Sequence, residues 1–209
     1  WSDGMQIELA KAMSELTLDV IGRTIFGVAL RGDAPEVADA LDTVLSGFAR
    51  GLTPWTSPLS RIPTKRRRRE VHAIEELDTI VDDLIERRRS DVSRGDAGTD
   101  LLTLLLTATD DQGNPAFSGE EVRDEAMTLV LAGHETTALT LTWALNLLSH
   151  DPDRRRWLEA EVDALPDRPL TPDDLGRLPR TYAVIAESMR LHPPAWIIGR
   201  WLDKDLREA

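Results

Sequence analysis

The stretch that decides the fold is residues 118–151, which read SGEEVRDEAMTLVLAGHETTALTLTWALNLLSHD. This stretch predicts one long helix. Ser118 and Glu121 have the spacing of a capping box, in which each side chain bonds a backbone N–H at the helix start. Asp151-Pro152 ends the helix, which is roughly 30 residues or about 45 Å long. Because its side chains are mostly apolar on every face, we expect this helix to be buried.

The middle of the predicted helix, residues 132–137 (AGHETT), breaks several local rules. Glycine costs about 1 kcal/mol relative to alanine inside a helix, and a buried carboxylate such as Glu135 is costly unless it is paired. Conflicts of this kind are expected at functional sites. His134-Glu135 matches the first half of the zinc-hydrolase pattern His-Glu-x-x-His, but Ala138 stands where the second histidine would be. A zinc site of that kind is therefore excluded.

Two interpretations of this irregular middle stay open on the residues alone. In the first, the Thr136 hydroxyl bonds the carbonyl of Ala132 and, beside Gly133, lets the helix open to admit a small ligand or water. In the second, a buried helix tolerates its threonines through internal hydrogen bonds, and Glu135 pairs with a basic neighbour. The stretch alone favours neither interpretation.

Composition limits the classes of function that the chain can have. The 209 residues are 41% hydrophobic and 30% charged, as in a globular protein, and the net charge of −12 argues against nucleic acid as the main partner. The absence of cysteine excludes disulfides, thiolate nucleophiles and cysteine-based zinc sites in this chain. We expect no signal peptide within these residues, and they contain no apolar run long enough to span a membrane. Neither Trp1 nor Ala209 has terminal character, so we expect an internal piece of a longer protein.

The remainder of the chain is predicted to be almost wholly helical, because apolar residues recur at the helical period and Gly, Pro and turn clusters separate the segments. The expected helices are residues 7–26, 34–48, 64–85, 99–109, 152–165, a short helix from residue 171, and 181–191. The expected loops are 51–63 and 110–115, and residues 195–199 give the only strand signal. The basic run 65–69 is interpreted as the solvated start of a helix, because the chain is acidic and no aromatic residues are interleaved.

Two of the later helices carry specific expectations. Trp157, Val162 and Leu165 share the side of the 152–165 helix that should be buried. Glu187 and Arg190 have the i, i+3 spacing of an ion pair, which is weak evidence when the pair is exposed. Because Leu-His-Pro-Pro follows at once, we expect a partly buried pair whose guanidinium group fixes that loop.

The two motifs together, Ala-Gly-His-Glu-Thr-Thr at 132–137 and Glu-x-x-Arg-Leu-His-Pro-Pro at 187–194, resemble the cytochrome P-450 family of haem-thiolate monooxygenases. Their order and separation match as well. Residues 15–27 resemble the helix that precedes the family's substrate lid, and the helices around the 51–63 loop resemble the lid. The resemblance implies a mainly α fold, in which residues 1–209 form the central part of a single domain truncated at both ends.

This resemblance also implies roles for individual residues. Ala132 and Gly133 would line a groove that leaves room for dioxygen on the haem iron. Thr136 would hydrogen-bond the iron-bound oxygen, and Glu135 would relay protons. Glu187 and Arg190 would form a structural ion pair, and Arg200 would be a cation against a haem propionate.

One departure from the family pattern is decisive, because the family's iron is held by a cysteine thiolate and this chain has no cysteine. No metal ligand is therefore expected in this chain, and the chain alone is expected to be inactive and marginally stable. For the longer protein, the resemblance implies haem, dioxygen, a small apolar organic substrate, and electrons from NAD(P)H through a ferredoxin or flavin reductase. It also implies a cytoplasmic, bacterial-type protein, with a membrane anchor left open. The alternatives are a non-catalytic helical ligand-binding or regulatory module and a degenerate pseudo-enzyme.

Overall fold

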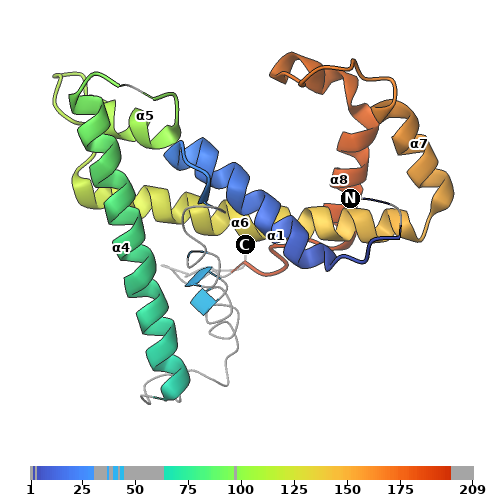
Figure 1. Cartoon of the computed structure of the whole chain (residues 1–209), viewed down its shortest axis with the longest axis horizontal. Helices are drawn as coiled ribbons and strands as arrows, with labels where there is room; N and C mark the ends of the chain where they lie inside the picture. Colours follow the sequence, from blue (N-terminus) through green and yellow to red (C-terminus); the bar gives the residue numbers. More distant parts are fainter. Residues whose placement is uncertain are drawn as a thin grey trace, which may run out of the picture. The chain divides into compact units, whose positions relative to one another are not determined.

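The computed structural model describes residues 2, 4–30, 37, 40, 41, 43, 44, 64–96 and 98–198, and these residues are mainly helical, as the sequence predicts (Figure 1). The elements are α1 (Leu9–Ile21), a π-helical turn η1 (Gly22–Phe26), α4 (Lys65–Ser93), α5 (Leu101–Thr107), α6 (Gly119–Ser149), α7 (Pro152–Val162), a 3₁₀ helix η4 (Pro172–Arg177) and α8 (Pro179–Leu191). The chain divides into two compact units, Trp1–Glu135 and Thr136–Ala209. Helix α6 is continuous and contributes to both units.

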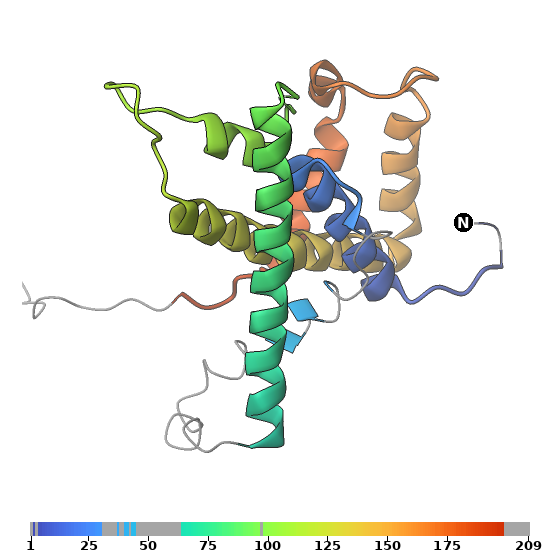
Figure 2. The ribbon, with the colours of Figure 1, turned by 60° about the vertical axis from the view of Figure 1, so that its left-hand side comes forward.

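A hydrophobic core fills the first unit. Its buried side chains come from α1, η1, α4, α5 and the first half of α6, and they include the fully buried Leu77, Leu102 and Val122. Both views show α4 crossing the first half of α6 steeply (Figures 1 and 2). The basic run 65–69 forms the exposed start of α4, where the Thr64 side chain accepts a hydrogen bond from the Arg67 N–H at 3.1 Å. The interpretation of this run as a solvated helix start is confirmed.

Helix α1 ends in a π-helical turn that is tied to α4. Gly27 follows η1 in the left-handed region at φ 70°, which glycine adopts without strain. Arg88 of α4 donates a hydrogen bond from Nη2 to the carbonyl of Phe26 at 3.1 Å. A Cβ at position 27 would collide with this guanidinium group. The glycine therefore allows both the backbone turn and the close approach of Arg88.

Asp100 connects α4 to the start of α5. Its carboxylate accepts hydrogen bonds from the backbone N–H and hydroxyl of Thr103, and one of its oxygens lies 3.1 Å from Arg88 Nη2. The two charged side chains are 3% and 13% exposed, so this ion pair is nearly buried. One carboxylate thus caps a helix and partners the cation that holds the end of η1.

The long helix predicted over residues 118–151 is confirmed. The Ser118 N–H donates to Glu121 Oε2 at 2.8 Å, and the Glu121 N–H donates to Ser118 Oγ at 3.2 Å, which completes the capping box. At the other end Asp151 caps α7, whose first residue is Pro152. The expectation that α6 is buried all round was wrong for this chain, because Leu129, Trp143 and other apolar side chains of the helix are exposed.

In the second unit, a carboxylate of α7 caps α8. Glu161 is 8% exposed and accepts hydrogen bonds from the backbone N–H groups of Arg180 and Thr181 at 2.8 and 2.9 Å. The predicted burial of Trp157 and Val162 was wrong, because they are 39% and 50% exposed. Trp157 lies one turn before Glu161 on the same side of α7, and its ring centroid is 5.1 Å from the guanidinium carbon of Arg180 in α8. Orphan N–H groups at a helix start attract an anion more strongly than the apolar pattern of α7 indicates.

Some of the predicted elements are absent or lie outside the described residues. Residues 195–198 form no strand, which corrects the sequence-based prediction, because no described segment offers them the backbone partners that a strand requires. Most of the predicted 34–48 helix, the whole 51–63 loop and Arg200 lie outside the described residues. Within the described part of the chain, no helix combines the length and apolar character needed to cross a membrane.

Candidate functional site

Residues 132–137 lie on α6 and divide between two of its faces. His134 is 5% exposed and points into the first unit, whereas Ala132, Glu135 and Thr136 are exposed. Successive helical residues are about 100° apart, so Ala132 and Thr136 share a face that lies roughly 160° around the helix axis from His134. The predicted catalytic residues and the histidine next to them therefore have different surroundings.

His134 contacts α1 through Ser14. Its Nε2 lies 3.0 Å from Ser14 Oγ and 3.2 Å from the Ser14 carbonyl oxygen. The Thr17 hydroxyl also donates to that carbonyl, at 3.0 Å. These residues are 120 positions apart in the chain, and sequence analysis assigned His134 only to a zinc motif that failed. A buried polar group on an apolar helix was the signal that pointed to such a partner.

Gly133 has a packing role that the sequence did not reveal. A Cβ built at this position would lie 3.3 Å from Cδ1 of Ile21, which is closer than a relaxed contact between carbon atoms. Ile21 is buried at the end of α1. The glycine therefore lets α1 approach α6 closely. This packing role is separate from the expected role of Gly133 in a groove beside Ala132.

The opposite face of α6 is small or apolar and exposed. Ala132 and Thr136 are one helical turn apart on it, Leu129 precedes them, and Trp143 follows, with 38% and 39% exposure for the last two. Further along the helix, the Thr140 hydroxyl donates to the Thr136 carbonyl at 2.8 Å. Exposed apolar patches on folded proteins commonly mark binding surfaces.

Glu187 and Arg190 form the predicted pair on α8 but not its predicted setting. Arg190 donates from Nε and Nη2 to the two carboxylate oxygens, both at 2.7 Å. The hydrogen bonds from Arg190 lower the pKa of Glu187, and those same bonds raise the pKa of Arg190. The side chains are 53% and 65% exposed, so the expected partial burial was wrong for this chain. The forked geometry is present without a third partner among the described residues.

Two contacts of α8 with the second half of α6 were missed by sequence analysis. Ser188 is completely buried and donates its hydroxyl to the Thr140 carbonyl at 3.2 Å. The indole of Trp143 stacks on the ring of His192, with centroids 4.0 Å apart and planes 8° apart. Serine and histidine give no apolar periodicity, so no sequence pattern indicated either contact.

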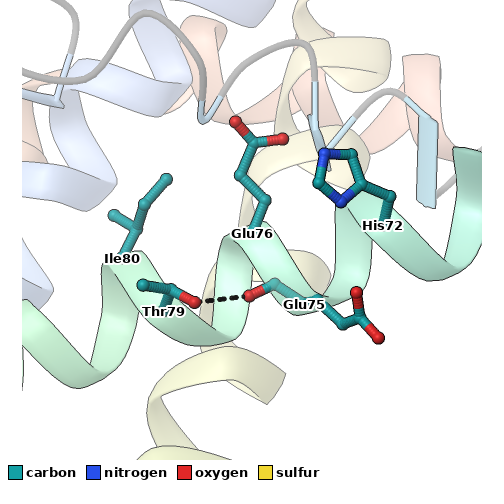
Figure 3. A pocket seen from close by; sticks show the side chains of 5 residues that line it. All are labelled: His72, Glu75, Glu76, Thr79 and Ile80. Atoms are coloured by element: carbon teal, nitrogen blue, oxygen red, sulfur yellow. Dashed lines mark hydrogen bonds between the residues drawn. The ribbon is translucent and has the colours of Figure 1, made fainter.

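A hollow of about 400 Å³ lies against α4, away from the predicted residues. Its described wall is one face of that helix, and His72, Glu76 and Ile80 extend to the same side (Figure 3). The dashed line in Figure 3 marks the Thr79 hydroxyl donating to the Glu75 carbonyl, a bond within the helix. The described residues contain no cluster of side chains that could hold a metal ion.

The chain matches the family model described as Cytochrome P450 over residues 2–208. It is 36% identical to cyclooctatin synthase of Streptomyces melanosporofaciens over 202 residues, which is 96% of this chain and 44% of that protein. It is also 36% identical to pentalenene oxygenase of Streptomyces avermitilis, over 99% of this chain and 45% of that protein. Among solved structures, the haem domain of cytochrome P450DA superposes with a TM-score of 0.73 at 30% identity, covering 90% of this chain and 41% of that one.

These matches define the class of protein: the chain belongs to the cytochrome P450 family. It spans less than half the length of the curated relatives described above. Membership implies a haem cofactor, and the resemblance noted in the two motifs is confirmed by a match over nearly the whole chain.

Proposed function

We propose that this chain is the central part of a longer haem-dependent monooxygenase that inserts one atom of dioxygen into an apolar organic substrate. The observation that carries the proposal is the exposed face of α6, on which Ala132 and Thr136 are one turn apart, within a chain that matches the family over residues 2–208. The proposal gives that face a partner, the haem. It also explains why a mostly apolar helix breaks local rules at residues 132–137.

The described residues can line only one face of a haem. Ala132 carries no bulk, and its exposed apolar neighbour Leu129 suits a flat apolar ring system. The chain contains no cysteine, so the thiolate ligand of the iron has to come from outside these 209 residues. When bound, the haem supplies an iron centre that activates dioxygen. Arg200 is proposed as a cation for a haem propionate, on its position in the sequence.

Thr136 and Glu135 are proposed to deliver the protons that the reaction consumes. One oxygen atom enters the substrate and the other leaves as water, so each turnover consumes two electrons and two protons. The Thr136 hydroxyl can donate a hydrogen bond on the exposed face of α6, and the neighbouring Glu135 carboxyl is exposed to solvent, from which it can take protons. Because Glu135 and Thr136 are consecutive residues of α6, a proton that Glu135 takes from solvent can be passed toward the Thr136 side.

The remaining roles depend on parts of the longer protein. Electrons are proposed to come from NAD(P)H through a ferredoxin or a flavin reductase. Glu187 and Arg190 leave Nη1 of the guanidinium group available to a further acceptor, and both side chains are half-exposed. We propose that a segment of the longer protein covers this pair and that the pair helps to hold the segment carrying the thiolate.

The test is the reduced, carbon monoxide-treated absorption spectrum of the 209-residue chain and of the longer protein from the same gene. The longer protein is expected to show the Soret band of a thiolate-ligated haem, and the 209-residue chain is expected to lack it. A longer protein that binds no haem would refute the proposed function. A thiolate band in the isolated chain would refute its proposed inactivity.

A further inference from the structure

We propose that Ser14 and His134 are a pair of positioning residues that fix the rotation of α6 about its own axis, and so fix the direction in which Ala132 and Thr136 face. This inference rests on the proposed function for its chemical consequence. The contact itself is independent of that function.

The His134 ring contacts two atoms of Ser14. His134 is 5% exposed, and its Nε2 lies 3.0 Å from Ser14 Oγ and 3.2 Å from the Ser14 carbonyl oxygen. A carbonyl oxygen only accepts, so a proton on Nε2 lets the imidazole donate to it. A ring held at two atoms of one residue has little freedom to swing. The contact therefore fixes the azimuth of residue 134 relative to α1.

A second contact lies two turns further along α1. The backbone of Gly133 meets Ile21 so closely that a Cβ on the glycine would lie 3.3 Å from Cδ1 of the isoleucine. Ser14 and Ile21 are seven residues, or about 10 Å, apart along their helix. Two separated contacts on α1 restrain adjacent residues of α6, so they resist rotation where one contact would act as a pivot.

A rotation of α6 about its axis would displace the Thr136 side chain, which lies almost opposite His134 on the helix. With a side-chain atom about 5 Å from the helix axis, a rotation of roughly 10° moves that atom by about 1 Å. A misplacement of about 1 Å in a catalytic group can cost on the order of 100-fold in rate. Loosening His134 should thus affect the Thr136 face more than it affects whether α6 forms.

The structure also separates positioning from stability. The Ser14 carbonyl keeps a hydrogen bond from the Thr17 hydroxyl at 3.0 Å when His134 is replaced. The Ser14 carbonyl therefore remains hydrogen-bonded in such a variant. A glutamine at position 134 offers an amide that can donate to the same carbonyl, so His134→Gln should preserve the positioning that His134→Leu removes.

The experiment compares His134→Leu, His134→Gln and Ser14→Ala in the longer protein, with Ser149→Ala as the matched control. Ser149 lies on the same helix, is exposed, and bonds only locally to Asn146 and His150 among the described residues. Hydrogen–deuterium exchange of the α1 peptides reports the contact. The affinity of the haem for imidazole and for the bulkier 4-phenylimidazole, both of which ligate iron through nitrogen, reports the space beside α6.

We expect His134→Leu to speed hydrogen exchange in α1 about tenfold and to leave exchange in α5 unchanged. The same variant should bind 4-phenylimidazole about tenfold more weakly, with less than a twofold change in its affinity for imidazole. His134→Gln should stay within about threefold of the wild type in both assays, and Ser14→Ala should fall between the two. Unchanged α1 exchange in His134→Leu would overturn the contact, with or without haem. Equal effects on both azoles, or a glutamine variant as impaired as the leucine variant, would overturn the positioning role. Absence of haem would instead count against the proposed function, and the exchange result would still decide the contact.

Discussion

The Asp100 carboxylate lies 3.1 Å from Nη2 of Arg88, with both side chains almost completely withdrawn from solvent. The same carboxylate caps α5, and the same guanidinium group bonds the last carbonyl of η1. Removing one partner of a nearly buried ion pair leaves an uncompensated charge. We therefore expect Asp100→Ala to lower the free energy of unfolding by about 3–5 kcal/mol in the longer protein, measured by urea titration.

The matched control for this change is Asp82→Ala. Asp82 is 54% exposed and lies 3.7 Å from Arg123, so its loss should cost less than about 1 kcal/mol. If the two variants are equally stable, the ion pair at the end of η1 does not hold the first unit together.

Glu161 makes the contact between α7 and α8 dependent on pH. Burial raises the pKa of this carboxyl, but the N–H groups of Arg180 and Thr181 outweigh burial and hold the pKa below its usual value of 4.5. The unfolded chain therefore binds more protons than the folded one in this region, so stability is complete above about pH 4.5 and falls as the pH drops. The protection of the first α8 amides, measured as their exchange rate relative to unfolded peptide at the same pH, should fall on acidification.

Glu161→Gln should show fast exchange at the α8 start at neutral pH and a weaker dependence on pH. Glu159→Gln is the control, because Glu159 is exposed and pairs only with Arg155 among the described residues. Equal pH profiles for the wild type and Glu161→Gln would contradict the capping role.

Gly133 and Ile21 should be energetically coupled. Gly133→Ala gains about 1 kcal/mol of helix propensity but brings a methyl group within 3.3 Å of Ile21 Cδ1. Ile21→Val removes that δ-carbon. A double-mutant cycle on unfolding free energies should therefore give a favourable coupling of about 0.5–1 kcal/mol between the two substitutions. Strict additivity would show that α1 does not rest on Gly133.

Thr136→Ala should impair the use of reducing equivalents in the longer protein, because the side chain proposed to donate on the haem-facing side is lost. We expect roughly a tenfold or greater rise in hydrogen peroxide released per NAD(P)H oxidised. Thr136→Ser should retain most of the wild-type behaviour. Thr137→Ala, a neighbouring exposed threonine on another face of α6, should have little effect. Comparable effects at 136 and 137 would refute the assigned role of Thr136.

Features with local causes were predictable from the sequence. The capping box of Ser118 and Glu121 and the Pro152 boundary depend on residues within a few positions of one another, and both are present. The family was likewise indicated by two short motifs and is confirmed over residues 2–208.

Features with distant causes were not predictable. The burial of Glu161 depends on N–H groups 19 and 20 residues away, and the partner of His134 is 120 residues away. No helical or strand period encodes such pairs. The predictions that all of α6 is buried and that Glu187 is partly buried were wrong for a different reason. The residues that would cover these side chains are not among the described residues.

The central claim is that the Ala132–Thr136 side of α6 faces a haem and that the His134 side faces α1. It is tested most directly by a crystal structure of the haem-loaded longer protein, in which the distances from the iron to Thr136 Oγ1 and to His134 Nε2 are compared. We predict that Thr136 Oγ1 is the nearer atom and that His134 stays within hydrogen-bonding distance of Ser14. An iron nearer to His134, or a Thr136 side chain turned away from the haem, would contradict the claim.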